Sequence, residues 1–485
     1  MAKSIKKNYF YNILLNVSKV IFPLITAPYV SRVLEPDGIG LFNFANTYAT
    51  YFSLFAALGI PIYGIREIAK IKDKTIDEKN KFVSEIISIS IVATIICTSF
   101  FVATLFFIPQ LNDNFVVFVI AAIVLYITPF RIDWFFSGLE DFGYITFRSL
   151  VIKTASVLLL FLLVKNKEDL VVYVALNALS LVANEIWNYC ILYKLGMHPY
   201  FTLNGRKHIK PLLLLFLSSV AVSIYTVLDT IMLGFITNYD EVGYYNSAVH
   251  LSKAILPIVT SLSVVALPRI ATYYKENNWG KINELMNKSF SLVSFLAFPI
   301  AFGLMAIAPV FVPQFFGVSF VGAVAPLQVV SLIIIAIGFN NLLGIQFLAS
   351  IGCDKQLLLS ISSGAVLNCL LNFILIPSWG AVGACASSVC AETLIVIIMI
   401  YYVLNKTKLK FRYHDTIVAC FFSLTFFFIV KILEMFADGW ELIILFGFIS
   451  SLLYLTSQYL LKNPYAICVF VYINKIIKNS VVILK

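Results

Sequence analysis

Long apolar runs separated by short polar loops dominate the sequence, and this pattern leaves few folds open. A helix that spans a membrane needs about 20 apolar residues, and 60% of the 485 residues are hydrophobic while only 12% are charged. The sequence therefore predicts an all-α integral membrane protein with about fourteen transmembrane helices. We place these spans at residues 9–30, 39–63, 82–108, 114–137, 144–164, 170–194, 211–236, 242–267, 287–315, 322–349, 357–376, 380–404, 414–434 and 440–461. A soluble enzyme with one membrane anchor is excluded, because too little polar sequence remains for a second domain.

The basic residues predict the orientation of these spans. Cytoplasmic loops of membrane proteins carry an excess of Lys and Arg. If the N-terminus is cytoplasmic, the inner segments hold 26 Lys and Arg residues and the outer loops hold 3. We therefore expect an even number of helices with both termini in the cytoplasm, and we attribute the net charge of +10 to topology rather than to nucleic-acid binding. A basic amphipathic tail, residues 465–485, is expected to lie on the membrane surface.

A short motif occurs twice and predicts an internal repeat. Segment Asp37–Asn43 has the sequence DGIGLFN, and segment Asp240–Asn246 has the sequence DEVGYYN. Asp, Gly and Asn match at a constant offset of 203 residues, which also carries Arg66 onto Arg269. The alternative is a generic tight-turn sequence. Six helices per repeat would keep both halves in one orientation, related by a pseudo-two-fold axis along the membrane normal. We expect six-helix bundles at 1–200 and 201–410, and two further helices at 411–464.

Polar side chains recur on one face of several predicted spans. A polar group at mid-membrane is costly, so it tends to face a cavity or a partner. Asn12, Asn16 and Lys19 share one helix face in the first span, and the repeat offset carries a similar stripe from the second span into the eighth. The alternative is ordinary hydrogen bonding between helices. The polar residues expected to line a cavity are Asn12, Asn16, Asn43, Thr47, Asn246 and His250.

Several basic residues inside the spans are candidates for binding an anion. They are Lys19, Arg131, Arg148, Lys153 and Lys253. Lys19 and Lys253 lie too deep to reach the interface easily, and a desolvated cation is rarely kept without an anionic partner. Arg131 and Arg148 could instead be interfacial anchors. Internal ion pairs are a further alternative, such as Lys253 with Asp229, or Asp133 with Arg131.

Three carboxylates inside the spans could bind a coupling ion, although each could be structural: Asp229, Glu185 and Glu392. The sequence has no GxxxxGK[ST] loop and no soluble domain that could hold a nucleotide. Energy for transport would therefore come from an ion gradient, the membrane potential or a substrate gradient. The eight cysteines form no CxxC or Cys/His cluster, so we expect neither a metal site nor a cofactor.

Motifs along nearly the whole chain, in order, resemble the polysaccharide (oligosaccharide-lipid) flippase family, in its O-antigen or Wzx-type branch. They are PYVSRVL at 28–34 with DGIG at 37–40, LGIPIYGIRE at 58–67, DWFFSGLE at 133–140, LDTIMLG at 228–234 with VGYYN at 242–246, and LPR at 267–269. The superfamily also contains multidrug exporters and the lipid II flippase. The resemblance implies two six-helix bundles around a central cavity, two peripheral helices and alternating access.

The resemblance also implies a function. It implies a flippase, not an enzyme, that moves undecaprenyl-diphosphate-linked oligosaccharide units across the bacterial cytoplasmic membrane for surface polysaccharide synthesis. The cations named above would then hold the anionic diphosphate while Asn, Ser and Thr bind the sugars. Expected partners are the lipid-linked oligosaccharide and membrane lipids, with a polysaccharide polymerase and a chain-length regulator as candidates. The alternative is a multidrug-type exporter coupled to Na⁺ or H⁺.

Overall fold

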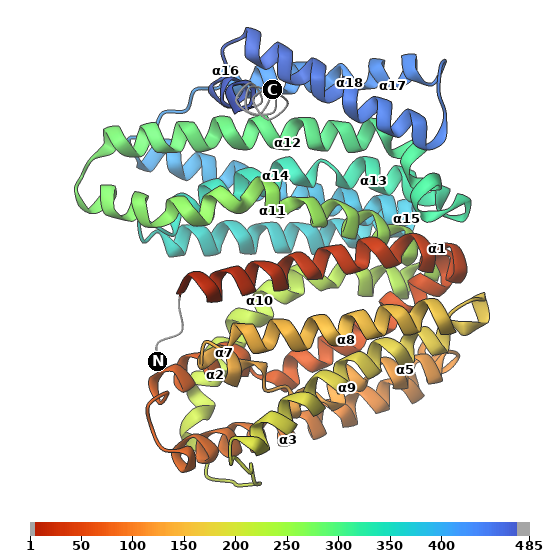
Figure 1. Cartoon of the computed structure of the whole chain (residues 1–485), viewed down its shortest axis with the longest axis vertical. Helices are drawn as coiled ribbons and strands as arrows, with labels where there is room; N and C mark the ends of the chain where they lie inside the picture. Colours follow the sequence, from red (N-terminus) through yellow and green to blue (C-terminus); the bar gives the residue numbers. More distant parts are fainter. Residues whose placement is uncertain (1–4, 473–485) are drawn as a thin grey trace, which may run out of the picture. The chain divides into compact units, whose positions relative to one another are not determined.

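The computed structural model describes the fold of residues 5–472, and every regular element in this range is helical (Figure 1). The chain divides into two compact units, Met1–Gly243 and Tyr244–Lys485. The predicted bundle boundary after residue 200 rests on the sequence repeat and stays a prediction. The predicted amphipathic tail lies mostly outside the described residues, although its first residue, Tyr465, packs against the apolar core of the second unit.

The first unit is built around one long, broken helix. Its elements are α1 (Ile5–Ala57), α2 (Ile60–Lys70), α3 (Ile76–Phe107), α4 (Pro109–Asn112), α5 (Phe115–Ala121), α6 (Ile123–Tyr126), η1 (Thr128–Phe130), α7 (Asp133–Gly138), α8 (Phe142–Leu163), η2 (Lys167–Asp169), α9 (Leu170–Lys194), α10 (Arg206–Ile236) and the start of α11 (Tyr239–Lys275). Helix α1 rises about 80 Å over its length, more than twice a bilayer core of about 30 Å. It is broken at Glu35, where φ is 58° and ψ is 177°, just before Pro36. One helical element therefore supplies two spans.

The second unit contains the remainder of α11 and a similarly broken helix. Its other elements are α12 (Trp279–Phe316), η3 (Val318–Ala323), α13 (Val324–Val330), α14 (Ile333–Asn340), η4 (Asn341–Leu348), α15 (Asp354–Lys406), α16 (His414–Leu424), α17 (Phe426–Leu433) and α18 (Gly439–Leu460). Helix α15 is interrupted at Gly380, where φ is 51°. Glycine adopts this conformation without the steric cost that a side chain adds.

The apolar helices agree with a membrane protein of many spans. Nine helices in the described part are long and apolar enough to cross a membrane, or ten if the bent pair in α11 is one span. By length α1 and α15 each supply a second span, and the shorter apolar helices Phe115–Phe130 and Val227–Ile236 are further candidates. With the bent pair counted as one span, these helices add up to fourteen, and the predicted number of spans stays a prediction.

Several predicted spans are divided or end differently in the structure, and two of them show why. The span predicted at 39–63 ends at Ala57, because Leu58 and Gly59 both have positive φ. The span predicted at 114–137 is divided into α5, α6, η1 and α7. Pro129 lies in its middle, where a proline cannot donate the backbone hydrogen bond that a continuous helix requires.

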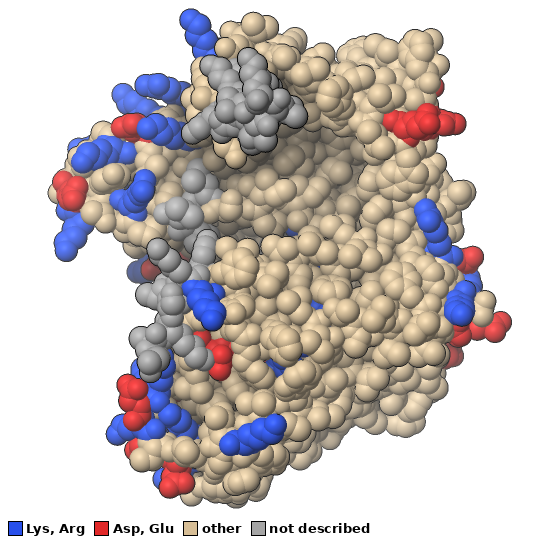
Figure 2. All heavy atoms as spheres, in the orientation of Figure 1, with Lys and Arg blue, Asp and Glu red and all other residues tan. Residues whose placement is uncertain are grey.

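The charged residues follow the ends of the helices. Figure 2 shows, on the face in view, Lys, Arg, Asp and Glu gathered where the helices of each unit end, with a broad surface of other residues between them. A bilayer core accepts such an apolar band and excludes charges. The distribution therefore supports helices that cross the membrane.

The two copies of the repeated motif meet in a reciprocal contact. A Cβ atom placed on Gly40 would collide with the backbone oxygen of Tyr239, and one placed on Gly243 would collide with that of Pro36. Tyr239 and Gly243 follow Pro36 and Gly40 by 203 residues each. Glycine is needed at both positions because the backbones approach so closely.

A polar ladder on α3 fixes the segment between α9 and α10. Asn80 donates from Nδ2 to the His198 oxygen at 3.2 Å, while the Ser84 and Ser88 hydroxyls accept from the backbone N–H groups of Tyr200 and Thr202 at 3.0 and 2.9 Å. Four helical residues rise about 6.0 Å, and two extended residues rise about 6.6 Å. Every fourth residue of the helix therefore meets every second residue of the extended segment.

The second unit repeats this ladder at the same offset. Asn283 and Asn287 on α12 are 203 residues after Asn80 and Ser84. Asn283 accepts from the Lys410 N–H at 2.8 Å and donates to the Lys408 oxygen at 3.1 Å. Asn287 accepts from the Arg412 N–H and donates to the Lys410 oxygen, both at 2.8 Å. The offset of 203 residues therefore relates this hydrogen-bonded ladder as well as the two short sequence motifs.

Replacing both Asn283 and Asn287 with Ala is expected to release the segment 407–413. Four hydrogen bonds are lost, each worth about 1 kcal/mol net. Amide hydrogen exchange at Lys410 and Arg412 should accelerate by about 10-fold or more, as measured by mass spectrometry. Asn405→Ala, at an exposed position, is the matched control. Unchanged exchange in the double variant would contradict the role of the ladder.

Candidate functional site

Two basic residues from different helices lie near each other in the first unit. Lys19 on α1 is exposed, and its Nζ donates to Asn16 Oδ1 at 3.4 Å. Asn16 in turn donates to Asn12 Oδ1 at 3.2 Å. Lys153 on α8 is half-buried, and its charge is close enough to interact with that of Lys19. The structure thus places the polar stripe of the first predicted span beside a cation of the fifth.

Contacts between α1 and α8 hold the two cations in place. The Thr146 hydroxyl on α8 donates to the Tyr11 backbone oxygen on α1 at 3.0 Å. Gly143 packs on the Tyr11 ring, where a Cβ would come within 3.2 Å. Lys153 Nζ lies 5.8 Å from the centre of the Phe22 ring on α1. A small residue, a hydroxyl and an aromatic ring therefore set the spacing between the helices.

The two ammonium groups lack a neutralising carboxylate. Within the described part of the chain, neither Lys19 nor Lys153 forms an ion pair. Like charges that lie close together repel, and the repulsion is strongest where water is excluded. A bound anion between the two side chains would remove this repulsion. Phosphate and diphosphate groups are anions that lysine binds in this way.

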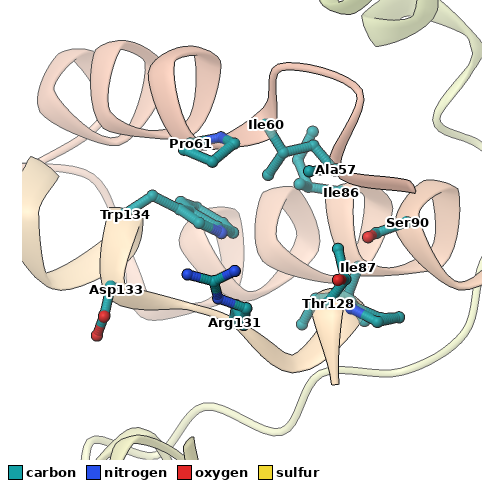
Figure 3. Close-up of a pocket in the computed structure, with 11 residues that line it drawn as sticks. Ala57, Ile60, Pro61, Ile86, Ile87, Ser90, Thr128, Arg131, Asp133 and Trp134 are labelled. Atoms are coloured by element: carbon teal, nitrogen blue, oxygen red, sulfur yellow. The ribbon is translucent and has the colours of Figure 1, made fainter. Parts of the chain in front are cut away.

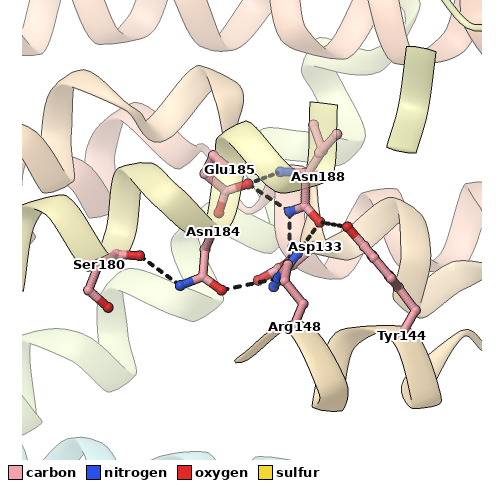
Figure 4. A network of polar contacts seen from close by, with 8 residues as sticks. Asp133, Tyr144, Arg148, Ser180, Asn184, Glu185 and Asn188 are labelled. Atoms are coloured by element: carbon pink, nitrogen blue, oxygen red, sulfur yellow. Dashed lines mark hydrogen bonds and ion pairs between the residues drawn. The ribbon is translucent and has the colours of Figure 1, made fainter. Parts of the chain in front are cut away.

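Arg148 lies in a buried polar network between α7, α8 and α9 (Figure 4). Its side chain is only 1% exposed. Nε donates to Asn184 Oδ1 at 3.0 Å, Nη1 donates to Asn188 Oδ1, and Nη2 pairs with Asp133 Oδ1 at 2.8 Å. The three nitrogens are all engaged within the protein. This arrangement favours a structural role for Arg148 over direct contact with a substrate.

Glu185 belongs to the same network but is not paired with the arginine. Its Oε2 accepts from Asn188 Nδ2 at 2.8 Å and from the Ile132 N–H at 3.3 Å. Asn188 also donates to Asp133 Oδ1 at 3.0 Å. The network therefore contains two carboxylates and one guanidinium group. It carries an excess negative charge when both carboxylates are ionised, and a proton or a cation would balance it.

Arg131 is separate from this network and lines a cavity. Asp133 pairs with Arg148, so the possible pairing of Asp133 with Arg131 is wrong. The side chains of Arg131 and Asp133 point in different directions. Figure 3 shows Arg131 pointing into the cavity and Asp133 pointing away from it. The cavity encloses about 140 Å³ and is also lined by Trp134 and Ser90. Arg131 is exposed and forms no ion pair within the described residues.

The other predicted site residues are placed as follows. In the first unit Asp229 is buried, and Asn43 and Thr47 are half-buried. In the second unit Asn246 is buried, while His250 and Lys253 on α11 are exposed and close enough to interact electrostatically. Glu392 is buried and accepts from Asn340 Nδ2 at 2.8 Å. Lys253 and His250 thus form a second group of basic side chains, on α11 in the second unit.

A buried cluster that the sequence analysis missed links α2, α3 and α10. Glu85 Oε2 contacts His208 Nε2 at 2.8 Å and Lys207 Nζ at 2.9 Å. The Tyr63 hydroxyl lies 2.7 Å from His208 Nδ1. Glu85 falls inside the predicted span 82–108, so the rule that singled out Glu185 would also have found it. His208 and Tyr63 carry no comparable signal.

Residues 5–274, more than half of the chain, match the family described as polysaccharide biosynthesis protein. The chain belongs to the polysaccharide biosynthesis protein family. Among related members, a candidate O-antigen transporter of Escherichia coli (strain K12) is 26% identical over 84% of this chain and 98% of its own length. A candidate flippase of low-salt glycan biosynthesis, Agl15 of Haloferax volcanii, is 25% identical over 40% of this chain and 41% of its own.

Solved structures support the fold of this polysaccharide biosynthesis protein. The lipid II flippase MurJ, in an inward closed conformation, superposes with a TM-score of 0.74 at 16% identity, covering 94% of this chain and 99% of MurJ. A multidrug resistance MATE family transporter in an inward-facing conformation gives a TM-score of 0.60 at 15% identity, covering 79% of this chain and 92% of its own. The predicted all-α integral membrane fold is confirmed.

Proposed function

We propose that this family member is a flippase that moves undecaprenyl-diphosphate-linked oligosaccharide units across the bacterial cytoplasmic membrane by alternating access. Both termini would lie in the cytoplasm, as the distribution of basic residues predicts. Membership of the family and the O-antigen transporter relative support a lipid-linked sugar as substrate. A polysaccharide polymerase and a chain-length regulator would act on the product outside.

The pair of Lys19 and Lys153 is the observation that carries this proposal. Two neighbouring cations in apolar helices, with no carboxylate partner among the described residues, suit a ligand with two negative phosphates. Asn12 and Asn16 beside them offer amide groups for sugar hydroxyls. The prenyl chain can remain in lipid, so only the headgroup needs a polar path.

Further cations would contact the headgroup at other stages of transport. Arg131 points into its cavity and forms no ion pair with the residues that the structure describes. Lys253 and His250 are exposed on α11. We keep these three as candidate ligands for phosphate or sugar, and we assign Arg148 to positioning α7, α8 and α9.

The alternative, an ion-coupled exporter of cationic drugs, is less well supported. Lys19 and Lys153 would repel a cationic substrate. The likeness to a MATE family transporter is at the level of the fold. The Asp133–Glu185 network is the feature that would suit ion coupling, and it serves a flippase equally well.

Glu185→Gln is expected to remove the dependence of transport on an ion gradient. The amide keeps the size of the side chain but cannot exchange a proton or hold a cation. Transport in reconstituted vesicles under an imposed Na⁺ or H⁺ gradient should fall to the rate measured without a gradient. Glu434→Gln, which alters an exposed pair with Lys431, is the matched control. Gradient-driven stimulation that persists in Glu185→Gln would remove the coupling role.

The proposed function is tested in cells by depleting the protein. Lipid-linked oligosaccharide should then accumulate on the cytoplasmic face, out of reach of a sugar-oxidising reagent added outside. Surface polysaccharide should fall in parallel. Normal surface polysaccharide after depletion, together with increased sensitivity to cationic drugs, would favour the exporter instead.

A further inference from the structure

An apolar groove lies along α3 and α10 in the first unit, away from Lys19 and Lys153. It encloses about 580 Å³ and is lined mainly by apolar side chains. On α3 these include Val92 and Ile96, and on α10 they include Leu213 and Phe216. Val92, Ile96 and Leu213 are more than 40% exposed. The groove therefore opens to the surface and is not part of the packed core.

The groove has the depth of one leaflet of a membrane. Its lining on α3 extends from Ser88 to Cys97. Nine residues of helix rise about 14 Å, close to half of a hydrocarbon core of about 30 Å. On α10 the described lining begins at Arg206, in the first turn, and reaches Phe216. An acyl chain of the predicted inner leaflet would fit along this length.

Two cations lie on the first turns of α10: Arg206 lines the groove, and Lys210 lines the surface next to it. Arg206 and Lys210 are four residues apart on α10, so they share one face of the helix. Both are exposed, and neither forms an ion pair within the described part of the chain. Lys207 between them is different, because it pairs with the buried carboxylate of Glu85 at 2.9 Å. The charge of Arg206 at the groove and that of Lys210 one helical turn away are therefore not neutralised by a carboxylate that the structure describes.

A second, shallow hollow along α10 adjoins the groove. It is open to the surface, has a volume of about 490 Å³, and is lined by residues that include Lys210, Leu214 and Leu217. The two hollows share Arg206, together with Ile209 and Leu213. Arg206 thus borders both hollows. This arrangement matches a phosphate that carries two hydrocarbon chains.

The wall of the groove is held in place before any ligand binds. Thr202 lines the groove, and its backbone N–H donates to the Ser88 hydroxyl at 2.9 Å. The Tyr200 N–H is held in the same way by Ser84 at 3.0 Å. Phe55 and Phe216 contact each other edge to face at 5.4 Å and both line the groove. A preformed site loses little conformational entropy on binding.

We propose that this surface binds an anionic phospholipid of the inner leaflet, with its phosphate between Arg206 and Lys210 and its two acyl chains in the adjoining hollows. The site is separate from the residues proposed to bind the transported substrate. Its occupant is a diacyl lipid rather than the substrate, because a prenyl-linked sugar has a single chain that would fill one hollow only.

The test uses the purified full chain in nanodiscs, with phosphatidylglycerol or phosphatidylcholine as the probe. Native mass spectrometry counts the retained lipids, and a titration gives their affinity. Arg206→Gln with Lys210→Gln removes both charges. Ala93→Phe fills the groove, since Ala93 is part of its lining. Lys275→Gln with Lys355→Gln, two exposed cations of the second unit, is the matched control.

The unaltered chain and the control should prefer phosphatidylglycerol. The Arg206/Lys210 variant should bind it about 30-fold more weakly, since each basic residue contributes about 1 kcal/mol near an anionic surface. Ala93→Phe should lose one retained lipid of either type. Unchanged preference in the charge variant, or an unchanged lipid count in Ala93→Phe, would overturn the proposal. So would displacement of phosphatidylglycerol by undecaprenyl phosphate, which would assign the groove to the substrate chain.

Discussion

Replacing Lys19 and Lys153 together with Ala is expected to abolish transport while the protein remains in the membrane. Each cation would lose a charge-assisted contact with the diphosphate, worth about 1.5–3 kcal/mol. The two losses together correspond to at least about 100-fold slower export. Surface polysaccharide measures the transport, and immunoblotting of membranes measures the abundance.

The unliganded protein should not be destabilised by this change. The two ammonium groups repel each other and have no carboxylate partner in the described chain, so their removal relieves strain. Lys19→Arg with Lys153→Arg keeps both charges and should retain most of the export. Lys431→Ala, which removes a cation paired with Glu434, is the matched control. Full export in the double Ala variant at normal abundance would refute the phosphate-recognition role.

Arg148→Ala is expected to have a large effect of a different kind, which is loss of the folded protein. The change leaves Asp133, Asn184 and Asn188 without their shared donor in a buried site. Asp133 is 51% exposed and keeps its hydrogen bond from Asn188, so its charge is not left buried. The cost comes from the lost charge-assisted hydrogen bonds to Asn184 and Asn188, about 1.5–3 kcal/mol each, together a large part of the stability of a typical domain. Abundance in the membrane should fall steeply, and the melting temperature of any purified protein should be lower.

Two further variants separate structure from substrate binding. Arg148→Lys should rescue poorly, because an ammonium group cannot reach three acceptors with the planar geometry of a guanidinium group. Arg131→Ala, the matched control, should leave abundance unchanged, because Arg131 is exposed and forms no ion pair within the described part of the chain. If Arg148→Ala reaches normal abundance but fails only in export, Arg148 contacts the substrate after all.

The sequence predicted features that depend on spacing along the chain. The repeat at an offset of 203 residues predicted two related halves, and the ladders of Asn80 and Asn283 carry the same offset. The stripe of Asn12, Asn16 and Lys19 on one face of α1 is present because helical periodicity alone determines it. Features of this kind can be predicted without knowing how the helices pack against one another.

Features that depend on packing could not be predicted. Arg131 and Arg148 look alike in the sequence, since both are basic residues near the ends of predicted spans. The structure buries Arg148 among three acceptors and leaves Arg131 exposed. The difference arises from the break around Pro129, which divides the predicted span and directs Asp133 towards α8. No pattern along the chain reveals which helix faces that carboxylate.

The most direct test measures translocation by the purified protein in liposomes. The substrate is a polyprenyl-diphosphate-linked oligosaccharide with a fluorescent label on its sugar, and a membrane-impermeant reagent quenches the label outside. With the unaltered protein, the label should move between leaflets far faster than in protein-free liposomes, and the Lys19→Ala/Lys153→Ala protein should not accelerate it. Equal rates with the unaltered protein, with the double variant and without protein would contradict the proposed flippase.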